Sequence, residues 1–337
     1  MASIDDIFKY NSVSFVGLAK NAGKTTCLNY IIDKARFIDK QIAVTSIGLD
    51  GESTDQVTQT SKPEIEIYEG MIFITSEKHF REKRLTAEIL DVSDEQTSLG
   101  RLVFAKAVTP GKVILSGPAD TCLLKKCLSH LRKWNTDTVL VDGALSRLSL
   151  ASPTVTDAMI LVTGAAVAKT IPELVRKTKY VYDRICLETV DDKIREQLAD
   201  ISDGLWSLDK EGRLYNLDIP SVFMIEKYKD RLFEYGTSFF VPGVLSDNFL
   251  EFLRIQKNTE DMSIIVKDFS RIFVKPEVYY SFLRKGGKIK VLWKNKLLGL
   301  CMNPDSPEGY RLDKDLLKKA LEEELKISVY NVRDMLN

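Results

Sequence analysis

The chain has 337 residues, long enough for one large or two ordinary domains with buried cores. Apolar residues make up 44% and charged residues 28%, the proportions typical of a globular protein in water. Basic and acidic residues number 48 each, so no net field favours nucleic acid or an anionic membrane as a partner. The first residues lack an export signal and no stretch approaches ~20 apolar residues, so we expect a cytoplasmic protein that binds neither nucleic acid nor membrane.

The first informative stretch, residues 12–26, predicts a buried strand, a tight loop and a helix that continues to about Lys34. Glycines at the two ends of the loop allow backbone N–H groups to approach an anion, and the positive end of the helix dipole points at the same place. The lysine that follows the second glycine supplies charge to the β and γ phosphates, and the next hydroxyl can ligate Mg²⁺. The sequence therefore predicts a site for MgATP formed by Gly17, Lys20, Asn21, Ala22, Gly23, Lys24, Thr25 and Thr26.

The spacing of this loop is unusual. Its first glycine, Gly17, lies one residue earlier than in most such loops, where this chain has Leu18. A Gly-x5-Gly-Lys-Thr loop resembles that of dethiobiotin synthetase and the cobyrinate amidases, in the class of P-loop proteins that includes MinD and nitrogenase iron protein. The lysine that MinD-type proteins insert across a dimer would fall at Ala19, and Lys20, the neighbouring candidate, is out of register. A homodimer across this face stays an open expectation.

Residues Gln41–Gly48 predict a second strand, apolar on both faces as in a parallel sheet. Acidic residues follow its carboxyl end, which is where ligands bind in open α/β sheets. Asp50 is the first candidate for a catalytic role and a Mg²⁺ contact, with Glu52 and Asp55 behind it. An Asp-Gly turn that only ends the strand explains the same residues equally well.

Residues 60–116 predict an antiparallel insertion. Alternating runs at Glu64–Glu69 and Met71–Ser76 indicate a hairpin, and further strands are expected at Glu88–Val92, Gly100–Val108 and Lys112–Ser116. Such insertions commonly carry substrate or partner contacts. An amphipathic helix is expected after it, at Ala119–Trp134.

The second informative stretch is an apolar strand that runs from Asp137 into Asp142-Gly143. An aspartate at that strand end holds Mg²⁺ opposite Thr25 in nucleotide-hydrolysing sites, so Lys24, Asp142 and Asp50 form the predicted catalytic set, with Thr25, Asp142 and Asp50 as the metal contacts. The stretch is similar to the Glu-Gly-Ala-Gly of dethiobiotin synthetase, with aspartate for glutamate. A strand at Asp157–Gly164 and a helix at Pro172–Asp183 continue the alternation of a doubly wound sheet.

The predicted fold class is therefore α/β: a P-loop NTPase-type parallel sheet flanked by helices, with an antiparallel insertion and a C-terminal α/β unit. A polar stretch near 191–212 suggests two domains, 1–190 and 191–337. Nothing in the second domain resembles another phosphate loop. Its expected strands are Ser221–Ile225, Ser238–Val241, Ser263–Val266, Lys288–Trp293 paired with Lys296–Met302, and Ile327–Val332, and its expected helices are Asp247–Gln256, Pro276–Lys285 and Asp313–Leu325.

Two further patterns concern the nucleotide base that the site would bind and the roles of the cysteines and histidines. The Asn-Lys-x-Asp motif of guanine-specific P-loop proteins is absent, because Asn295-Lys296 is followed by two leucines, so ATP is the expected nucleotide. The chain has five cysteines without a Cys-x-x-Cys pair, which we expect to be buried and reduced. Its two histidines make a histidine-rich metal site or a Ser-His-Asp triad hard to build, and His130 is expected on a helix surface.

Several segments together resemble the P-loop component of the reactivase for lysine 5,6-aminomutase. They are Thr45–Glu52, Lys62-Pro63, Val141–Ala144 with Arg147 and Leu150–Pro153, Val162–Ala165 and Asn303–Tyr310. The resemblance implies an ATP-dependent, chaperone-like role. A MutS-like ATPase subunit would be its partner, and the pair would replace damaged cobalamin on a coenzyme B12-dependent aminomutase.

The residues alone leave three hypotheses open. The first is an ATPase that remodels a protein partner, the second an ATP-dependent ligase of the dethiobiotin synthetase type, and the third a nucleotide-binding adaptor with little turnover. A cobyrinate-type amidase is disfavoured because no histidine follows Cys186 or Cys301. The chain also exceeds the size of a single-domain ligase by roughly a hundred residues, which favours protein contacts.

Overall fold

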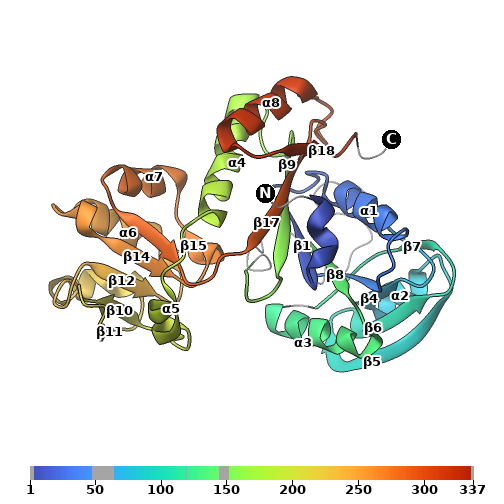
Figure 1. Cartoon of the computed structure of the whole chain (residues 1–337), viewed down its shortest axis with the longest axis horizontal. Coiled ribbons are helices and arrows are strands. Elements are labelled where there is room, and N and C mark those ends of the chain that lie inside the picture. Colours follow the sequence, from blue (N-terminus) through green and yellow to red (C-terminus); the bar gives the residue numbers. More distant parts are fainter. Residues whose placement is uncertain (1–3, 48–63, 119, 144–151, 335–337) are drawn as a thin grey trace. The chain divides into compact units, whose positions relative to one another are not determined.

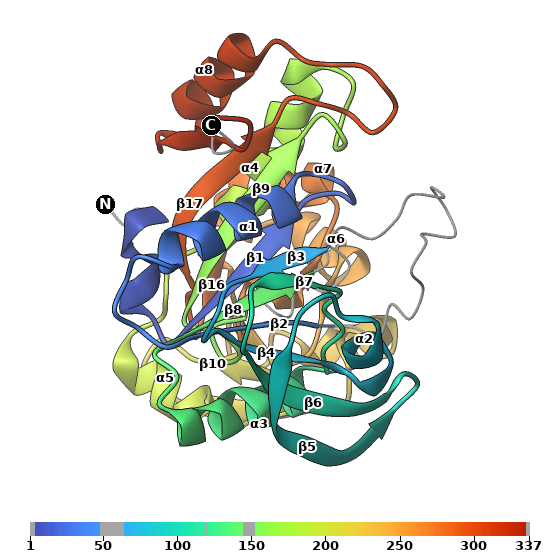
Figure 2. The ribbon, with the colours of Figure 1, turned by 90° about the vertical axis from the view of Figure 1, so that its right-hand side faces the viewer.

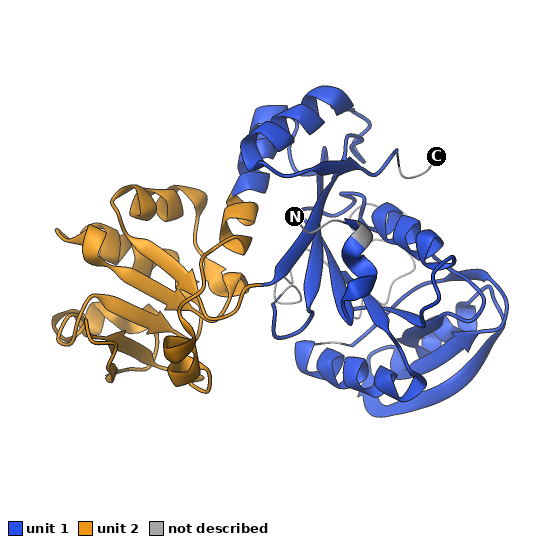
Figure 3. Ribbon diagram, viewed as in Figure 1, with its two compact units in different colours: residues 1–179, 295–337 blue, residues 180–294 orange. Residues whose placement is uncertain are grey.

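The computed structural model describes residues 4–47, 64–118, 120–143 and 152–334. The chain divides into two compact units, coloured separately in Figure 3: unit 1 holds residues 1–179 and 295–337, and unit 2 holds residues 180–294. The predicted domains, 1–190 and 191–337, differ from this division at the C-terminus, because residues 295–337 return to unit 1 and extend its sheet.

Unit 1 is built on a sheet of nine strands in the order β18-β17-β9-β1-β8-β2-β4-β6-β5 (Figure 1). Every neighbouring pair from β18 to β4 is parallel, and only β4–β6 and β6–β5 are antiparallel. The predicted α/β class with a large, mostly parallel sheet is confirmed. The bounds are β1 (Ser12–Gly17), β2 (Ile42–Ser46), β4 (Ile72–Ser76), β5 (Ala87–Thr97), β6 (Gly100–Ala107), β8 (Thr138–Gly143), β9 (Ala158–Gly164), β17 (Lys296–Asn303) and β18 (Val329–Asn331).

Helices bury apolar residues on the two faces of this sheet. On one face, α1 (Lys24–Ala35) and the 3-10 helix η1 (Ile4–Lys9) join a cluster that contains Phe15, Ile31 and Ile160. On the other face, α3 (Thr121–Leu131) buries its leucines against Val141 and Phe104. The strands between are apolar on both sides because both faces are covered. The remaining elements are α2 (Glu77–Glu82), η2 (Arg132–Trp134), α4 (Ile171–Ile185, which ends in unit 2) and α8 (Lys314–Leu325).

The antiparallel insertion exists, but its pairing differs from the prediction. The runs 64–69 and 71–76 form β3 (Ile65–Ile67) and β4, which do not pair with each other: β3 pairs with β7 (Gly111–Val113), and β4 lies between β2 and β6. Beside α2, β5 and β6 form a long curved pair (Figure 2). The predicted turn at Gly70 is present, with φ +86°, but it does not join a hairpin. Strand β4 is buried along its whole length because it lies inside the main sheet.

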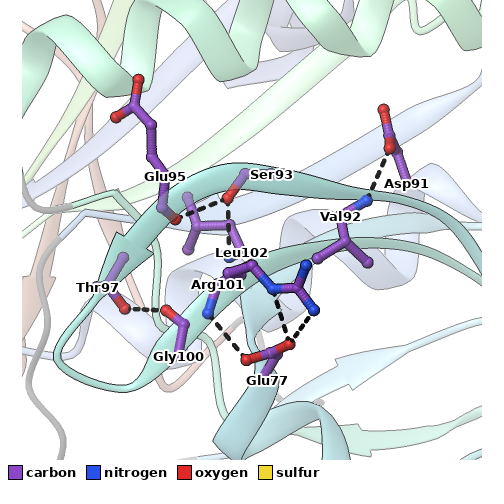
Figure 4. Close-up of polar contacts among 9 residues, drawn as sticks. All are labelled: Glu77, Asp91, Val92, Ser93, Glu95, Thr97, Gly100, Arg101 and Leu102. Carbon is purple, nitrogen blue, oxygen red and sulfur yellow. Dashed lines mark hydrogen bonds and ion pairs between the residues drawn. The ribbon is translucent and has the colours of Figure 1, made fainter.

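Polar side chains fix the β5–β6 hairpin (Figure 4). Arg101 donates from Nε and Nη2 to one oxygen of Glu77, at 3.1 and 2.9 Å, and its backbone N–H donates to the other. Ser93 Oγ accepts from the N–H of Leu102 where the strand register shifts. These bonds hold the hairpin to the start of α2.

Unit 2 is a smaller α/β unit whose sheet has the order β11-β10-β12-β14-β16. Strands β12, β14 and β16 are parallel, and β10 and β11 are antiparallel additions. Its elements are α5 (Asp192–Leu198), β10 (Leu205–Leu208), β11 (Leu214–Ile219), η4 (Val222–Lys227), η5 (Lys229–Arg231), β12 (Ser238–Val241), β13 (Leu245–Ser246), α6 (Asp247–Arg254), η6 (Thr259–Asp261), β14 (Ser263–Val266), η7 (Phe269–Arg271), β15 (Ile272–Phe273), α7 (Pro276–Arg284) and β16 (Lys288–Val291).

Three predictions in the second half were wrong. The strand expected at Ser221–Ile225 is the 3-10 helix η4, because the Ser221 hydroxyl accepts from the N–H of Phe223 and caps a helical turn. The expected pair of Lys288–Trp293 and Lys296–Met302 does not form, since β16 pairs with β14 and β17 pairs with β9. The stretch taken as a polar boundary, near 191–212, contains α5 and β10.

Candidate functional site

The loop after β1 is anchored by its apolar residues. Leu18 is 7% exposed and its N–H donates to the carbonyl of Val162 at 2.8 Å, while Ala22 is fully buried. Between them, Lys20 and Asn21 are exposed, and Asn21 has a positive φ of 59°. The loop is therefore tied to the neighbouring strand β9 at its start and to the core at its end, with its polar tip in solvent.

Gly17, the last residue of β1, makes room for the side chain of Lys24. A Cβ at Gly17 would lie 2.8 Å from Lys24 Cγ and 2.9 Å from Lys24 Cδ, closer than real Cβ atoms approach. The lysine side chain thus folds back over the end of β1 and across the loop. The stem of the lysine side chain therefore lies against Gly17.

Gly23 is the N-cap of α1, with φ 100° and ψ 13°, a conformation that L side chains rarely adopt. As a glycine, this N-cap residue has no side chain that could accept a hydrogen bond from the first turn of the helix. The first N–H groups of a helix lack intrahelical acceptors, and they carry the positive end of its dipole. The first turn of α1, which holds Lys24, Thr25 and Thr26, therefore presents donors to an anion in the loop.

Asp142 lies at the same edge of the sheet, on the strand beside β1. It pairs in register with Phe15 of β1 and with Ser46 of β2, and its carbonyl accepts from the N–H of Ile47 at 3.1 Å. Phe15 belongs to the core cluster on the α1 face, and laterally paired residues of parallel strands point to the same face. The Asp142 side chain is therefore on the face of α1, the helix that carries Thr25.

The end of β17 also lies beside the loop, next to Gly23. No residue of this strand was among the predicted site residues. A Cβ at Gly23 would lie 3.1 Å from Asn303 Cβ and 3.3 Å from Val332 Cγ2. The Asn303 carbonyl accepts from the N–H of Ala165 at 2.8 Å, which joins β17 to the end of β9. The signal available in the sequence was the segment Asn303–Tyr310, noted only for its resemblance.

An ion-pair cluster holds the chain that follows Asn303. The Asn303 side-chain oxygen accepts from the N–H of Asp305, and the two carboxylate oxygens of Asp305 accept from Arg311 Nε at 3.1 Å and Arg333 Nε at 2.5 Å. The Tyr310 hydroxyl donates to the carbonyl of Ala165. These contacts fix the ends of β9, β17 and β18 relative to one another beside the loop.

A buried polar cluster lies at the carboxyl end of β4. Ser116 Oγ accepts from the N–H of Ser76, donates to Ser76 Oγ at 2.7 Å, and lies 2.8 Å from His79 Nδ1. Thr75, Ser76, His79 and Ser116 are each at most 1% exposed. No sequence pattern predicted that the ring of His79 would be buried and fixed by Ser116. His130, expected on a helix surface, is half-buried, with Nε2 2.6 Å from an Asp91 oxygen.

Two cysteines meet under the first turns of α1. Cys27 and Cys301 are fully buried, with their Sγ atoms 3.3 Å apart, and the contact with Cys27 together with burial raises the pKa of the Cys301 thiol well above its usual value. Cys127 is also buried, and burial raises the pKa of its thiol to about 12. All five cysteines are reduced, although Cys122 is exposed and Cys186 is only partly buried, against the expectation that all five are buried.

The candidates Asp50, Glu52 and Asp55 lie outside the described residues, as does Arg147. Within the described ranges, no group of three histidine, cysteine or acidic side chains could enclose a metal ion. A Mg²⁺ held by Thr25, Asp142 and nucleotide phosphates needs no such group, because phosphate and water oxygens complete its shell. Within the same ranges, no helix has both the length and the apolar character needed to cross a membrane.

Comparisons with known proteins add little. No family model matches the chain, and no curated protein matches it. Among solved structures, the chain is similar to a structure of pNOB8 ParA bound to nonspecific DNA at 12% identity, covering 94% of this chain and 97% of that chain, with a TM-score of 0.24. A likeness at this TM-score supports no conclusion about fold or function, so the geometry of the site itself carries the assignment.

Proposed function

We propose that unit 1 binds MgATP at the loop between β1 and α1 and hydrolyses it. The observation that carries the proposal is the Lys24 side chain folded across Gly17 at the uncapped start of α1. Backbone N–H groups and an ammonium group meet there, and both favour the β and γ phosphates of a nucleotide. A turn that only capped a helix would need neither the left-handed Gly23 nor the close approach at Gly17.

In this proposal the metal binds between β1 and β8. The Thr25 hydroxyl and the Asp142 carboxylate would hold Mg²⁺ from opposite sides, directly or through water, and the ion would neutralise charge on the transferring phosphoryl group. Asp142 is partly buried as a residue, and its Oδ1 atom is buried. Lys24 would bind the β and γ phosphates, and Lys20 at the exposed tip would approach the phosphates from solvent.

The choice of adenine rests on the absence of a guanine-reading motif in the sequence. The nearest match, Asn295-Lys296, is also on the wrong side of the sheet: Lys296 begins β17, and β17 is parallel to β9 and β1. It therefore lies at the edge opposite the loop. Residues at that edge cannot contact a base whose phosphates lie on Gly23.

The direct test is MgATP binding by Lys24→Ala, measured by calorimetry. We expect affinity to fall by about a hundredfold or more while circular dichroism stays unchanged, since Lys24 is only partly buried at the start of α1. Lys319→Ala, in an exposed part of α8, is the matched control and should bind as the wild type does. Wild-type affinity in a folded Lys24→Ala chain would remove the phosphate-loop assignment.

We further propose that the ATPase serves as the nucleotide-hydrolysing subunit of a reactivating factor for an adenosylcobalamin-dependent aminomutase, with a MutS-like ATPase subunit as its partner. The support is the resemblance of the segments Thr45–Glu52, Val141–Ala144, Val162–Ala165 and Asn303–Tyr310 to the reactivase component. The last two of these segments supply the ends of β9 and β17 that border the loop. Slow turnover by the isolated chain is expected, because nucleotide hydrolysis by such proteins is often completed by a partner.

The partner proposal is tested by recovery of an inactivated aminomutase with ATP, fresh adenosylcobalamin and the MutS-like subunit. We expect recovery with the wild-type chain and none with Lys24→Ala. Equal recovery when the chain is omitted would end the reactivase proposal. ATP consumption with a small carboxylate substrate alone would favour the ligase, and tight MgATP binding with no turnover under either condition would favour the adaptor.

A further inference from the structure

The chain between β7 and α3 changes from one face of the main sheet to the other. Val113, the last residue of β7, belongs to the apolar cluster on the α1 face, whereas Leu123 of α3 belongs to the cluster on the opposite face. Residues 114–118 therefore make the crossing, and all but the first of them are buried. We call residues 114–118 the crossing segment.

Ser116 fastens the crossing segment to the end of β4. Its Oγ donates to Ser76 Oγ at 2.7 Å and accepts from the N–H of Ser76 at 3.1 Å, and its own N–H donates to Thr75 Oγ1 at 3.2 Å. Because the single hydrogen of the Ser116 hydroxyl is used on Ser76, His79 Nδ1 is the donor in its 2.8 Å contact with Ser116 Oγ. The Thr75 hydroxyl donates in turn to the carbonyl of Ile114 at 2.8 Å. The crossing segment is thus tied to β4 at two places.

The next residue, Gly117, lies directly against the end of β2. A Cβ at Gly117 would lie 1.6 Å from the carbonyl oxygen of Ser46 and 3.0 Å from Thr45 Oγ1. Any side chain there would displace either the crossing segment or the strand. Ser46 is the last residue of β2, so the contacts at β4 hold the backbone of the crossing segment against the carboxyl end of the neighbouring strand.

The end of β2 in turn adjoins the strand that carries Asp142. Ser46 pairs in register with Asp142, and the N–H of Ile47 donates to the Asp142 carbonyl at 3.1 Å. Laterally paired residues of parallel strands point to the same face, so the side chains of Ser46 and Asp142 both lie on the α1 face. The contacts that begin at Ser116 therefore continue through Gly117 and the end of β2 to the predicted metal carboxylate.

We propose that Ser116 is a positioning residue for Asp142 in the MgATP site, an inference that rests on the proposed function. In this role Ser116 contacts neither metal nor nucleotide and acts through the end of β2. Mg²⁺ requires near-octahedral geometry, and the groups that orient a metal ligand affect the metal almost as much as the ligand itself. Loosening the crossing segment should therefore weaken the use of Mg²⁺ and leave the phosphate contacts of Lys24 intact.

The test is ATP turnover by Ser116→Ala, measured as a function of Mg²⁺ concentration. We expect maximal turnover to fall by about tenfold and the Mg²⁺ concentration at half-maximal turnover to rise. ATP affinity without Mg²⁺, measured by calorimetry, should be unchanged because the loop is intact. The matched control is Thr138→Val, which removes another fully buried hydroxyl at the start of β8, where Thr138 Oγ1 donates to the carbonyl of Tyr10 at 2.9 Å. It should keep wild-type turnover and Mg²⁺ dependence.

A double variant distinguishes positioning of Asp142 from a general loss of stability. If Ser116 acts through Asp142, its removal should have little effect once the carboxylate is gone. Ser116→Ala combined with Asp142→Asn should then turn over ATP within about twofold of Asp142→Asn alone. Wild-type turnover in Ser116→Ala, or a further loss of about tenfold in the double variant, would overturn the proposal.

Two further measurements keep the result decisive. Without nucleotide, hydrogen–deuterium exchange in a peptide covering residues 42–47 should be faster in Ser116→Ala than in the wild type, and equal rates would contradict the proposal. If Ser116→Ala does not fold, His79→Asn, which keeps a donor near the Nδ1 position, should retain more turnover than His79→Leu, and equal turnover would contradict it. A wild-type chain that neither binds nor hydrolyses MgATP would instead end the proposed function, and this inference with it.

Discussion

Two strand-to-helix connections, one in each unit, begin alike and end differently. In unit 1, β1 leads through a glycine-flanked loop into α1, whose N-cap Gly23 has no side chain to accept from the helix. In unit 2, β12 leads through Pro242 and Gly243 to β13 and α6, where the Ser246 hydroxyl accepts from the N–H of Phe249. The Ser246 side chain caps the start of α6, whereas the glycine at the start of α1 supplies no side-chain acceptor, and we propose that a ligand takes that place.

Both units contain a parallel sheet, but they differ in the features on which the proposed nucleotide site depends. Both units present the carboxyl ends of parallel strands, but among the residues that the structure describes only unit 1 has a lysine that folds back over a glycine and an aspartate on the neighbouring strand of the same face. The chemistry is set by a few loop residues on a shared architecture.

The largest effect is expected from Asp142→Asn. The amide keeps the shape of the side chain but cannot supply the charge that holds Mg²⁺, so ATP turnover should fall by about a hundredfold. Nucleotide binding should change by no more than a few fold, because the loop and Lys24 are intact. Steady-state phosphate release and calorimetry measure the two quantities. Wild-type turnover in Asp142→Asn would transfer the metal role to another carboxylate, with Asp50→Asn as the next variant.

A smaller effect is expected from Gly23→Ala. At φ 100° a Cβ is strained, and it would also press on Asn303 and Val332, so the loop should shift and MgATP affinity should fall by about tenfold. Gly243→Ala is the matched change in unit 2, where a Cβ would meet nothing within 4 Å. It should leave both stability and affinity unchanged. Equal nucleotide affinities in the two variants would show that the conformation of Gly23 is not required.

Ser246→Ala removes the side-chain cap of α6 and tests the role of that cap. Loss of the hydroxyl should cost about 0.5 kcal/mol of stability, at the low end for an N-cap, because the bond to Phe249 N is long at 3.5 Å. Urea unfolding measures this change. MgATP affinity should be unaffected, and a large fall in affinity would contradict the view that the two connections have separate roles.

The smallest effect concerns acid stability of the β5–β6 hairpin. The N–H of Val92, which donates to Asp91 in Figure 4, lowers the pKa of Asp91, and the side chain of His130 lowers it further. Unfolded aspartate titrates near ~3.9, so the contribution of Asp91 is fully present above that pH and is lost as pH falls through its lower folded pKa. Asp91→Asn should therefore destabilise the chain slightly at pH 7 and hardly at all at the lowest pH. The same loss of unfolding free energy at both pH values would exclude a charge effect.

The sequence predicted those parts of the site that are local in the chain. The strand, loop and helix at 12–34 and the aspartate at the end of β8 follow from short patterns of glycine, lysine and apolar residues. The pairing of strands that are distant in the sequence could not be predicted from such short patterns. Residues 296–303 form an apolar strand whose sequence does not specify which strand it pairs with. Asn303 lies beside the loop only because β17 pairs with β9 and packs against Gly23.

Local capping explains other failures. Val222–Ile225 is as apolar as a strand, yet the Ser221 hydroxyl turns it into η4. Strand β11 has exposed positions and strand β10 has only four residues, so neither strand stood out from the turn residues around them, such as Gly204 and Gly212, both with positive φ. The short strand β3 pairs with β7, more than forty residues away, rather than with its sequence neighbour.

The central claim is that the open N-terminus of α1 binds the phosphates of MgATP and the capped N-terminus of α6 does not. Hydrogen–deuterium exchange of the wild-type chain with and without MgATP measures the protection of both helix N-termini in one experiment. The account predicts slower exchange in peptides covering residues 17–27 and no change in peptides covering residues 242–250. Unchanged exchange at 17–27 under saturating MgATP, or equal protection of both segments, would contradict it.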